Sequence, residues 1–351
     1  MSDRLRVGVV LGGRSSEREI SLESGRNIYY NLDPSRFEAL AIFMDGAGRL
    51  WEIGLPLLVQ NTTRDIEDRL AHDARRVRYE DLAGRVDFVY IGLHGKYGED
   101  GCFQGLLELL DVPYSGSGVL GSALGMDKRV QRELLRQEGI DVPRTRAVAR
   151  LEWEADRSGI VSSVADAPGF PCVVKPSREG CSTALAVVDA PERLAAAIDE
   201  ALVWDNFALV EERLAGTEVT VVVLCDGEPF AFAPTETPPA GAFLTIEEKF
   251  LPGQGTNITP ARLPADVLAA VRRTAERAFE VLGLQVFARI DMYVTLDGRI
   301  VVGEPNTLPG ASPSSTIFLG PIEEGIGPMD LVTRIIDLSL AAHRGKKGPL
   351  G

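Results

Sequence analysis

The first 120 residues alternate short, nearly continuous apolar runs with segments that have helical spacing. The runs "LRVGVVLGG" (5–13) and "VDFVYIGLHG" (86–95) predict buried strands of the parallel type, each ending in glycine. Ser16 and Glu19 fit an S-x-x-E capping box, so a helix is expected to start near Glu17. "FQGLLELLDVP" (103–113) predicts a short helix. This alternation indicates a doubly wound, mostly parallel α/β sheet.

The rest of the chain has a different pattern. One longer helix is expected over 118–139, closed by Gly139. The segment 170–188 reads as strand, polar glycine loop and strand, and Asp226-Gly227 predicts a hairpin. Antiparallel hairpins packed with helices indicate α+β units. We expect three domains, at 1–124, 125–213 and 214–351.

A second predicted hairpin brings charged side chains together near the C-terminal end. A two-residue Asp-Gly turn at 297–298 separates two apolar runs. Its register places four polar residues on one face in opposed pairs, Asp291 with Glu304 and Arg289 with Asn306.

Facing carboxylates repel each other unless a cation lies between them. An all-oxygen ligand set of Asp291, Glu304 and Asn306 points to magnesium or manganese. An exposed acidic face is the alternative reading of the pair. A turn of odd length would shift the register by one residue, and Asp291 would then no longer lie opposite Glu304.

Composition excludes several classes of protein. The formal net charge of −14 argues against a general nucleic-acid binder, because phosphate neutralisation needs a basic face. No stretch approaches the roughly 20 apolar residues of a membrane span. The four cysteines form no CxxC pair and the three histidines are scattered, which disfavours zinc. We expect a setting in the reducing cytoplasm.

A magnesium site predicts a phosphate ligand, because Mg²⁺ keeps water and phosphate oxygens in its coordination shell. Three lysines are candidates to bind a nucleotide. Lys175 ends an apolar strand before a glycine-containing loop, Lys128 lies on a predicted helix, and Lys249 lies in an irregular segment. A lysine taken alone is more often a solvated surface charge than a ligand. The sequence contains no Walker A motif, so the nucleotide is not held by a P-loop.

Taken together, these stretches resemble the D-alanine–D-alanine ligases of the ATP-grasp superfamily. The matching segments include "VVLGGRSSEREISLESG", "LHGKYGEDGCFQGLLELLDVPYSGSGVLGSALGMDK", "PCVVKPSREG", "ARIDMYV" and "EPNTLPG", in order over nearly the whole chain. The resemblance implies an α/β N-terminal domain followed by two α+β ATP-grasp subdomains. It also implies an ATP-dependent, ADP-forming ligase that joins D-alanine to D-alanine for peptidoglycan precursors. A homodimer is the family expectation.

The resemblance assigns roles to individual residues. It implies that Lys128, Lys175 and Lys249 hold the nucleotide phosphates. It gives adenine and ribose contacts to Glu211 and Glu218. The metal set is again Asp291, Glu304 and Asn306, here expected to hold two Mg²⁺ (or Mn²⁺) ions. On the substrate side it implies that Glu17 receives the ammonium of the first amino acid and that Arg289 stabilises the oxyanion. Further substrate-side positions are His94, Gly310 and Ser315.

Several positions depart from the family pattern. Cys181 stands where the family has a serine, and Phe250 where it has a tyrosine, in a hydrogen-bonded chain with Glu17. Pro305 separates two metal ligands, and the acceptor side has two small residues, Ala311 and Thr316.

These departures leave several alternatives open. The changes are either neutral or indicate a repurposed ligase for another amino acid or hydroxy acid. A different ATP-grasp reaction and a catalytically silent nucleotide-binding protein are more distant alternatives. Cys181 is disfavoured as a covalent nucleophile, because no histidine stands near it in the motif.

Overall fold

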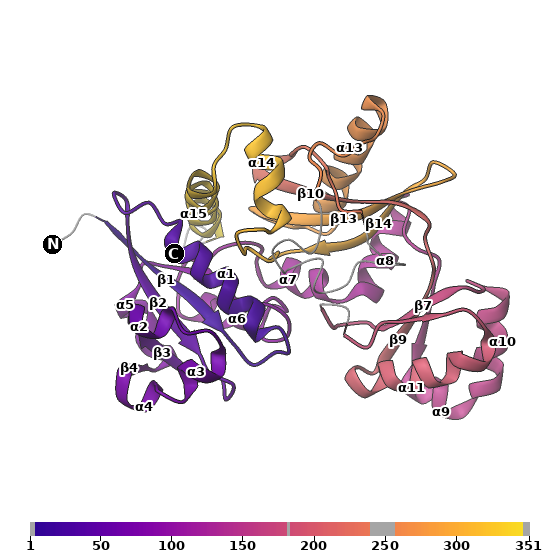
Figure 1. Ribbon diagram of the computed structural model, residues 1–351, viewed down its shortest axis with the longest axis horizontal. Coiled ribbons are helices and arrows are strands. Elements are labelled where there is room, and N and C mark those ends of the chain that lie inside the picture. The colour runs from indigo at the N-terminus through magenta and orange to yellow at the C-terminus, as the bar shows by residue number, and fades with distance from the viewer. Residues whose placement is uncertain (1–3, 181–182, 239–256, 347–351) are drawn as a thin grey trace.

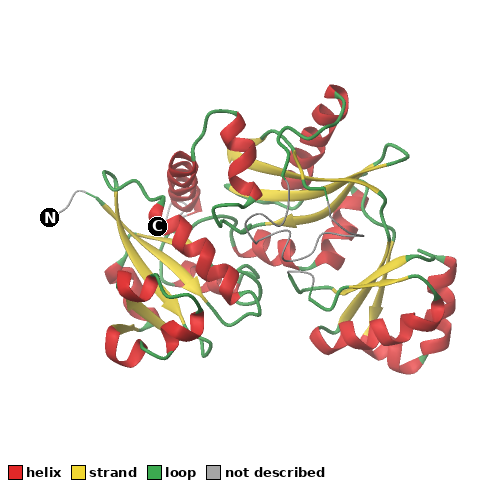
Figure 2. Cartoon of the chain, viewed as in Figure 1, coloured by secondary structure: helices red, strands yellow, loops and turns green. Residues whose placement is uncertain are grey.

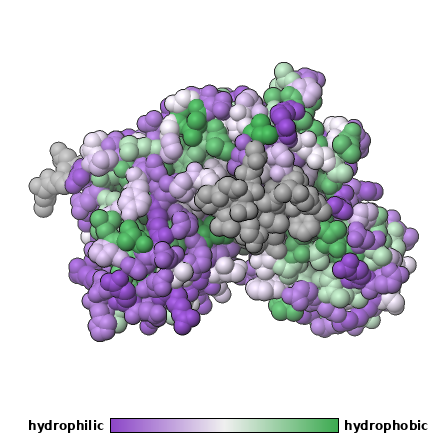
Figure 3. Space-filling view, viewed as in Figure 1, coloured by the Kyte–Doolittle hydropathy of each residue, from purple (hydrophilic) through white to green (hydrophobic). Residues whose placement is uncertain are grey.

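Three β-sheets with their covering helices build the protein (Figure 1; Figure 2). The computed structural model describes residues 4–180, 183–238 and 257–346. Within these ranges, no helix is long and apolar enough to cross a membrane. Figure 3 shows that hydrophilic residues dominate the visible outer face of the N-terminal unit.

The N-terminal sheet has the strand order β4-β3-β2-β1-β5. Its central strand β1 runs parallel to β2 and β5, whereas β2, β3 and β4 pair antiparallel. The expected α/β fold class is confirmed, with a mixed sheet around a parallel centre. The strands are β1 (Leu5–Gly12), β2 (Phe37–Met44), β3 (Leu50–Ile53), β4 (Ala74–Val77) and β5 (Phe88–Ile91). The helices of this unit are α1 (Arg18–Tyr30), α2 (Leu55–Leu58), α3 (Thr63–Glu67), α4 (Leu70–Asp73), α5 (Leu82–Arg85) and α6 (Cys102–Leu109).

Helix α1 starts where the sequence predicts, but its capping is different. No side chain caps its first turn. The carboxylate of Glu19 accepts hydrogen bonds from the hydroxyl and the backbone N–H of Thr63 on α3, at 2.5 Å and 3.1 Å. The expected capping box is therefore wrong, because a tertiary partner takes the Glu19 side chain that would have closed it.

The expected helix over 118–139 is broken into two, α7 (Val119–Met126) and α8 (Lys128–Gln137). Asp127 leaves the helical conformation, and its carboxylate accepts the N–H of Val130 at 3.1 Å. It is thus an N-cap for α8. The break places Lys128 in the first turn of α8, where its side chain is buried. Gly139 follows α8 with a left-handed φ of 75°, as expected of a helix end.

The central sheet has the antiparallel order β6-β9-β7-β8. The predicted strand, glycine loop and strand over 170–188 are confirmed as β7 and β8. Trp153, Ile160 and Ile198 from three covering helices fill the core under this sheet. The strands are β6 (Thr145–Ala149), β7 (Cys172–Pro176), β8 (Ala186–Val188) and β9 (Phe207–Glu212), and the helices are α9 (Arg150–Ala155), α10 (Arg157–Asp166) and α11 (Leu194–Trp204).

The C-terminal sheet has the antiparallel order β11-β10-β13-β14, with β12 also paired to β10. Its core contains Phe279 of α13 and Leu135 of α8, so α8 packs on this unit. Leu331 and Ile335 of α15 share a core with the N-terminal sheet. The strands are β10 (Gly216–Asp226), β11 (Glu228–Ala231), β12 (Thr235–Glu236), β13 (Phe287–Thr295) and β14 (Ile300–Asn306), and the helices are α13 (Ala265–Val281), α14 (Leu319–Glu323) and α15 (Pro328–Lys346).

The β13–β14 hairpin reaches the expected pairing by an unexpected route. Val294 pairs with Ile300 and the N–H of Thr295 bonds the carbonyl of Arg299, so the turn has three residues and not two. That odd length shifts the register near the turn by one residue. A β-bulge between Asp291 and Met292 then shifts the register back. The opposed pairs are consequently those predicted, Asp291 with Glu304 and Arg289 with Asn306.

The core under the C-terminal sheet should govern the stability of this unit. Phe279 is 1% exposed, so Phe279→Ala is expected to lower the free energy of unfolding by about 3–5 kcal/mol, because it leaves a cavity. Leu296, in the turn between β13 and β14, is 87% exposed. Leu296→Ala should change the unfolding free energy by less than about 0.5 kcal/mol. Urea unfolding of both variants checks this, and equal destabilisation would contradict the assigned core.

Candidate active site

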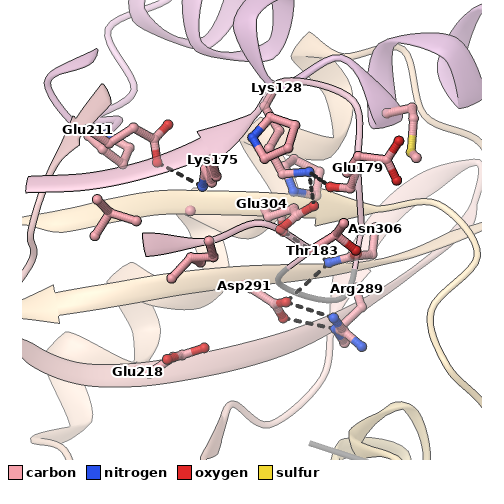
Figure 4. A pocket seen from close by; sticks show the side chains of 18 of the residues that line it. Lys128, Lys175, Glu179, Thr183, Glu211, Glu218, Arg289, Asp291, Glu304 and Asn306 are labelled. Carbon is pink, nitrogen blue, oxygen red and sulfur yellow. Dashed lines mark hydrogen bonds and ion pairs between the residues drawn. The ribbon is translucent and has the colours of Figure 1, made fainter. Parts of the chain in front are cut away.

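A cleft of about 540 Å³ lies where the three sheets meet. Figure 4 shows side chains from β7, β9, β13, β14 and α8 pointing into it. Most of the predicted site residues line its wall: Glu17, His94, Lys128, Lys175, Glu211, Glu218, Arg289, Asp291, Glu304, Asn306 and Gly310.

Six of the predicted site residues are not among those that line the cleft in the described part of the chain. Ala311, Ser315 and Thr316 follow the wall segment but do not line the cleft, and Ala311 and Ser315 are buried. Cys181, Lys249 and Phe250 lie outside the described residues.

The paired strands β13 and β14 present the oxygen donors of the cleft floor. Arg289 donates two hydrogen bonds to the carboxylate of Asp291, at 2.9 Å and 2.7 Å. The amide nitrogen of Asn306 donates to Asp291 at 3.1 Å, and the hydroxyl of Thr220 donates at 3.0 Å. The side chain of Asp291 is thus held in a fixed orientation by a bidentate guanidinium.

Lys128 connects α8 to the same floor. Its Nζ lies 2.7 Å from Glu304 Oε1 and donates to the backbone carbonyl of Glu179 at 2.7 Å. The Lys128 side chain is 4% exposed, whereas that of Glu304 is 33% exposed. A buried lysine needs a partner for its charge, and the carboxylate of Glu304 supplies one.

Glu211 on β9 lies between two cations. Lys175 Nζ is 2.8 Å from one carboxylate oxygen, and Arg132 Nε is 3.0 Å from the other. Burial alone would raise the pKa of Glu211, but the charges of Arg132 and Lys175 outweigh it and lower this pKa to about 2. Burial lowers the pKa of Lys175, against the opposing attraction of Glu211.

Glu218 lies further along the cleft, on β10. It accepts a hydrogen bond of 2.9 Å from the hydroxyl of Tyr293 on β13. Burial and the charge of Glu218 both raise the pKa of Tyr293, so this hydroxyl stays protonated and remains a donor.

Glu17 lies at the N-terminus of α1, between two glycines. A Cβ atom added at Gly95 would lie 2.4 Å from its carboxylate, and one at Gly180 would lie 2.5 Å from it. Only glycine allows the backbone to approach this closely. Glu99 lies nearby, and burial together with the charge of Glu17 raises its pKa well above the ordinary value. The nearby charge of Glu17 thus opposes ionisation of Glu99.

His94 is buried between α1 and the segment after β14. Its Nδ1 lies 3.0 Å from the carbonyl oxygen of Leu308, and its Nε2 lies 2.8 Å from the hydroxyl of Ser24. Burial lowers its pKa to about 4, so the imidazole is neutral near pH 7. A carbonyl only accepts, so Nδ1 carries the proton and Nε2 accepts from Ser24.

Sequence reasoning missed several cleft residues. Arg132 follows Lys128 by one helical turn, so the same face of α8 could have been followed to it. Glu99 stands in the quoted segment "HGKYGEDG", but its raised pKa depends on burial beside Glu17, which no local pattern reveals. Tyr293 could have been found by continuing the alternation of Arg289 and Asp291 along β13.

The oxygen donors on β13 and β14 fit a hard divalent cation. They are two carboxylates and an amide, the ligand chemistry of Mg²⁺. In the described ranges, no group of three or more His, Cys, Asp or Glu side chains is placed to hold a metal by itself. Glu304 and Asp291 are paired instead with Lys128 and Arg289. The donor set therefore suits a metal that also takes ligands from a bound phosphate.

The pairing of Glu211 predicts a specific response of stability to pH. The folded-state pKa of about 2 lies below the ordinary value of 4.5. Its contribution, about 3 kcal/mol, is therefore complete above pH 4.5 and is lost as the pH falls toward 2. Glu211→Gln should destabilise the protein near neutrality, and the gap to wild type should narrow below pH 4.5.

Urea unfolding at several pH values checks this, with Glu200→Gln, at an exposed position of α11, as the control. A gap for Glu211→Gln that stays constant with pH would contradict the pairing.

Comparisons with known proteins agree with this geometry. The sequence matches the family described as D-ala D-ala ligase N-terminus over residues 6–117 and D-ala D-ala ligase C-terminus over residues 134–337. A protein named D-alanine–D-alanine ligase from Kineococcus radiotolerans is 39% identical, over 97% of this chain and 98% of the relative. Another of that name from Pelotomaculum thermopropionicum is 34% identical, over 96% and 97%.

Solved structures give the same result. The D-alanine–D-alanine ligase from Coxiella burnetii superimposes with a TM-score of 0.84 at 28% identity, covering 98% of this chain and 96% of that one. The VanG D-Ala:D-Ser ligase from Enterococcus faecalis has a TM-score of 0.83 at 27% identity, covering 96% and 99%. The Bacillus anthracis ligase complexed with ATP has a TM-score of 0.76 at 29% identity, covering 97% and 99%. The chain belongs to the D-alanine–D-alanine ligase family of ATP-dependent, ADP-forming ligases.

Proposed function

We propose that this enzyme joins two molecules of D-alanine into D-alanyl-D-alanine, with conversion of ATP to ADP and phosphate, for peptidoglycan precursors. The observation that carries the proposal is the convergence of Glu17, Arg289 and the donors of β13 and β14 in one cleft. Full-length similarity to relatives that bear this name supports the substrate.

The proposed reaction has two steps. A carboxylate oxygen of the first D-alanine attacks the γ-phosphorus of ATP, and ADP leaves, which gives an acyl phosphate. The amine of the second D-alanine then attacks the carbonyl carbon, and inorganic phosphate leaves with the carboxylate oxygen. Glu17 would bind the ammonium of the first amino acid, and Arg289 would stabilise the oxyanion of the tetrahedral intermediate that the attack of the amine forms in the second step.

The nucleotide site follows from the cations of the cleft. Lys128 and Lys175 would contact the phosphates, together with Lys249. Glu211 and Glu218 would contact adenine and ribose. The ion pairs of Lys128 with Glu304 and of Lys175 with Glu211 support these roles. Before ATP binds, each ion pair neutralises the charges of its two side chains. In the complex, the phosphates of ATP would take the place of the carboxylates beside the lysines, and adenine would contact Glu211.

We propose that Asp291, Glu304 and Asn306 would hold Mg²⁺ or Mn²⁺, two ions in all. A metal bound there would neutralise charge on the transferring phosphoryl group. Lys128, which now pairs with Glu304, would contact a phosphate oxygen. Arg289, which now pairs with Asp291, would direct its guanidinium toward the carbonyl of the substrate.

A second candidate is ligation of D-alanine to a different acceptor, an amino acid or a hydroxy acid. Similarity to a D-Ala:D-Ser ligase favours it. So do the departures at Cys181, Phe250, Ala311 and Thr316, which remove hydroxyls or bulk from positions implied to serve the substrates.

Three further proposals concern the assembly of the enzyme. We infer domains at 1–124, 125–213 and 214–351, from the sequence pattern. We infer a homodimer, from the family alone. We place the enzyme in the cytoplasm, where ATP and reduced thiols are available.

The substrate proposal is tested by ADP release with D-alanine as the only amino acid. We expect ADP, phosphate and a mass corresponding to D-alanyl-D-alanine in equal amounts. D-Serine, D-lactate and L-amino acids run in parallel. Turnover only with D-alanine plus another acceptor would replace the first candidate by the second. ATP binding without turnover for any pair would contradict both.

The metal proposal is tested with Glu304→Gln. Loss of one anionic ligand is expected to lower kcat at least about 100-fold and to raise the Mg²⁺ concentration needed for half-maximal activity. EDTA should abolish activity of the wild type, and Mg²⁺ or Mn²⁺ should restore it. Glu228→Gln, at an exposed position of β11, is the control. Unchanged Mg²⁺ dependence in Glu304→Gln would contradict the assignment of Glu304 as a ligand.

A further inference from the structure

Helix α1 holds the segment 308–311, of which residues 308–310 line the cleft, by both backbone polar groups of Ala311. The backbone N–H of Ala311 donates to the hydroxyl of Ser24 at 2.9 Å. The carbonyl of Ala311 accepts from the amide nitrogen of Asn27 at 2.8 Å. Ser24 and Asn27 are three residues apart, so they lie on the same face of α1. Two side chains of α1 thus satisfy the N–H and the carbonyl of Ala311, as the backbone of a neighbouring strand would.

His94 extends this arrangement to Leu308. The imidazole donates from Nδ1 to the carbonyl of Leu308 and accepts at Nε2 from the hydroxyl of Ser24. Ser24 therefore uses its one proton on His94 and a lone pair on the N–H of Ala311. Ser24 is 1%, Ala311 5% and His94 6% exposed. Buried polar groups without partners are costly. All of these hydrogen bonds are satisfied together only when the segment 308–311 lies in this position.

The same face of α1 leads to Glu17. Ser21, one turn before Ser24, accepts the backbone N–H of His94 at 2.8 Å and donates to the carbonyl of Glu17 at 3.2 Å. Seven residues, or about 10 Å of helix rise, separate Glu17 from Ser24. One rigid element therefore fixes the distance between Glu17 and the 308–311 wall, although these groups come from opposite ends of the chain.

We propose that Ser24 and Asn27 are positioning residues that select the acceptor amino acid. They fix the 308–311 segment on α1 and so set the space between that wall and the first amino acid bound at Glu17. This inference rests on the proposed function, in which Gly310 and Ala311 belong to the acceptor side. Neither Ser24 nor Asn27 is among the residues that line the cleft, so both act through the backbone of the segment.

The test uses Ser24→Ala and Asn27→Ala in the full-length enzyme. Ser339→Ala is the matched control, because Ser339 is a buried helical serine whose hydroxyl bonds a carbonyl of α15. Each variant loses one direct hydrogen bond to Ala311, and this should raise the KM of the acceptor about tenfold, with the KM of the donor within about twofold. Both variants should also accept a competing D-amino acid more readily. Equal changes in both KM values, or none, would overturn the proposal.

A readout without turnover separates this inference from the proposed function. The chain has three histidines, so ¹⁵N spectra of the imidazoles are simple. His94 of the wild type should show a proton on Nδ1, and Ser24→Ala should disturb its Nε2 signal. Asn27→Ala, which does not touch the ring, should leave both signals unchanged. A wild-type His94 with its proton on Nε2 would overturn the arrangement.

Turnover of a pair other than D-alanine would overturn the proposed substrate but not this inference. The KM comparison is then made with the pair that the wild type uses.

Discussion

Buried charges in the central cleft are the constraint on which this structure depends. Lys128 and Glu211 are buried and are each stabilised by partners from other segments of the chain. Lys128 contacts Glu304 and the carbonyl of Glu179, and Glu211 contacts Arg132 and Lys175. An unpaired charge at such a depth would be costly, so these segments have to meet for either charge to be satisfied. Helix α8, the central sheet and the C-terminal sheet are therefore held around the cleft by the same side chains that the proposed chemistry uses.

Helix α1 positions the residues of the cleft that are proposed to contact the two amino acids. It carries Glu17 at its N-terminus and contacts His94 and the 308–311 segment through two serines and an asparagine. The N-terminal unit thus shapes the far wall of a site whose metal donors lie on β13 and β14. A two-substrate ligase needs a fixed separation between its two amino acids, since the amine must reach the activated carboxyl group. A single rigid helix is a direct way to provide it.

Much of this could be predicted from the sequence. The glycine loop after β7, the hairpins and the four opposed residues of β13 and β14 follow from local alternation and turn residues. The opposed pairs predicted from a two-residue turn are the observed ones. The turn has three residues, but the bulge next to Asp291 offsets the extra residue. Turn length and bulges depend on sheet twist and packing, which the local sequence does not encode strongly.

Other features arise only from tertiary contacts. The capping box of α1 failed because Glu19 finds Thr63, 44 residues away. The break at Asp127 reflects a side-chain cap that competes with helix continuation. The raised pKa of Glu99 and the low pKa of Glu211 come from groups that meet only in the folded protein. Sequence patterns identify candidate residues well, but they do not show which neighbouring groups will shift the pKa of each residue in the folded protein.

The central claim is that this cleft activates a carboxylate by phosphorylation before the amine attacks. The most direct measurement uses D-alanine labelled with ¹⁸O in its carboxyl group and mass spectrometry of the released phosphate. An acyl phosphate predicts one ¹⁸O atom transferred to phosphate for each ADP formed. Phosphate without ¹⁸O, released together with the dipeptide, would contradict the account.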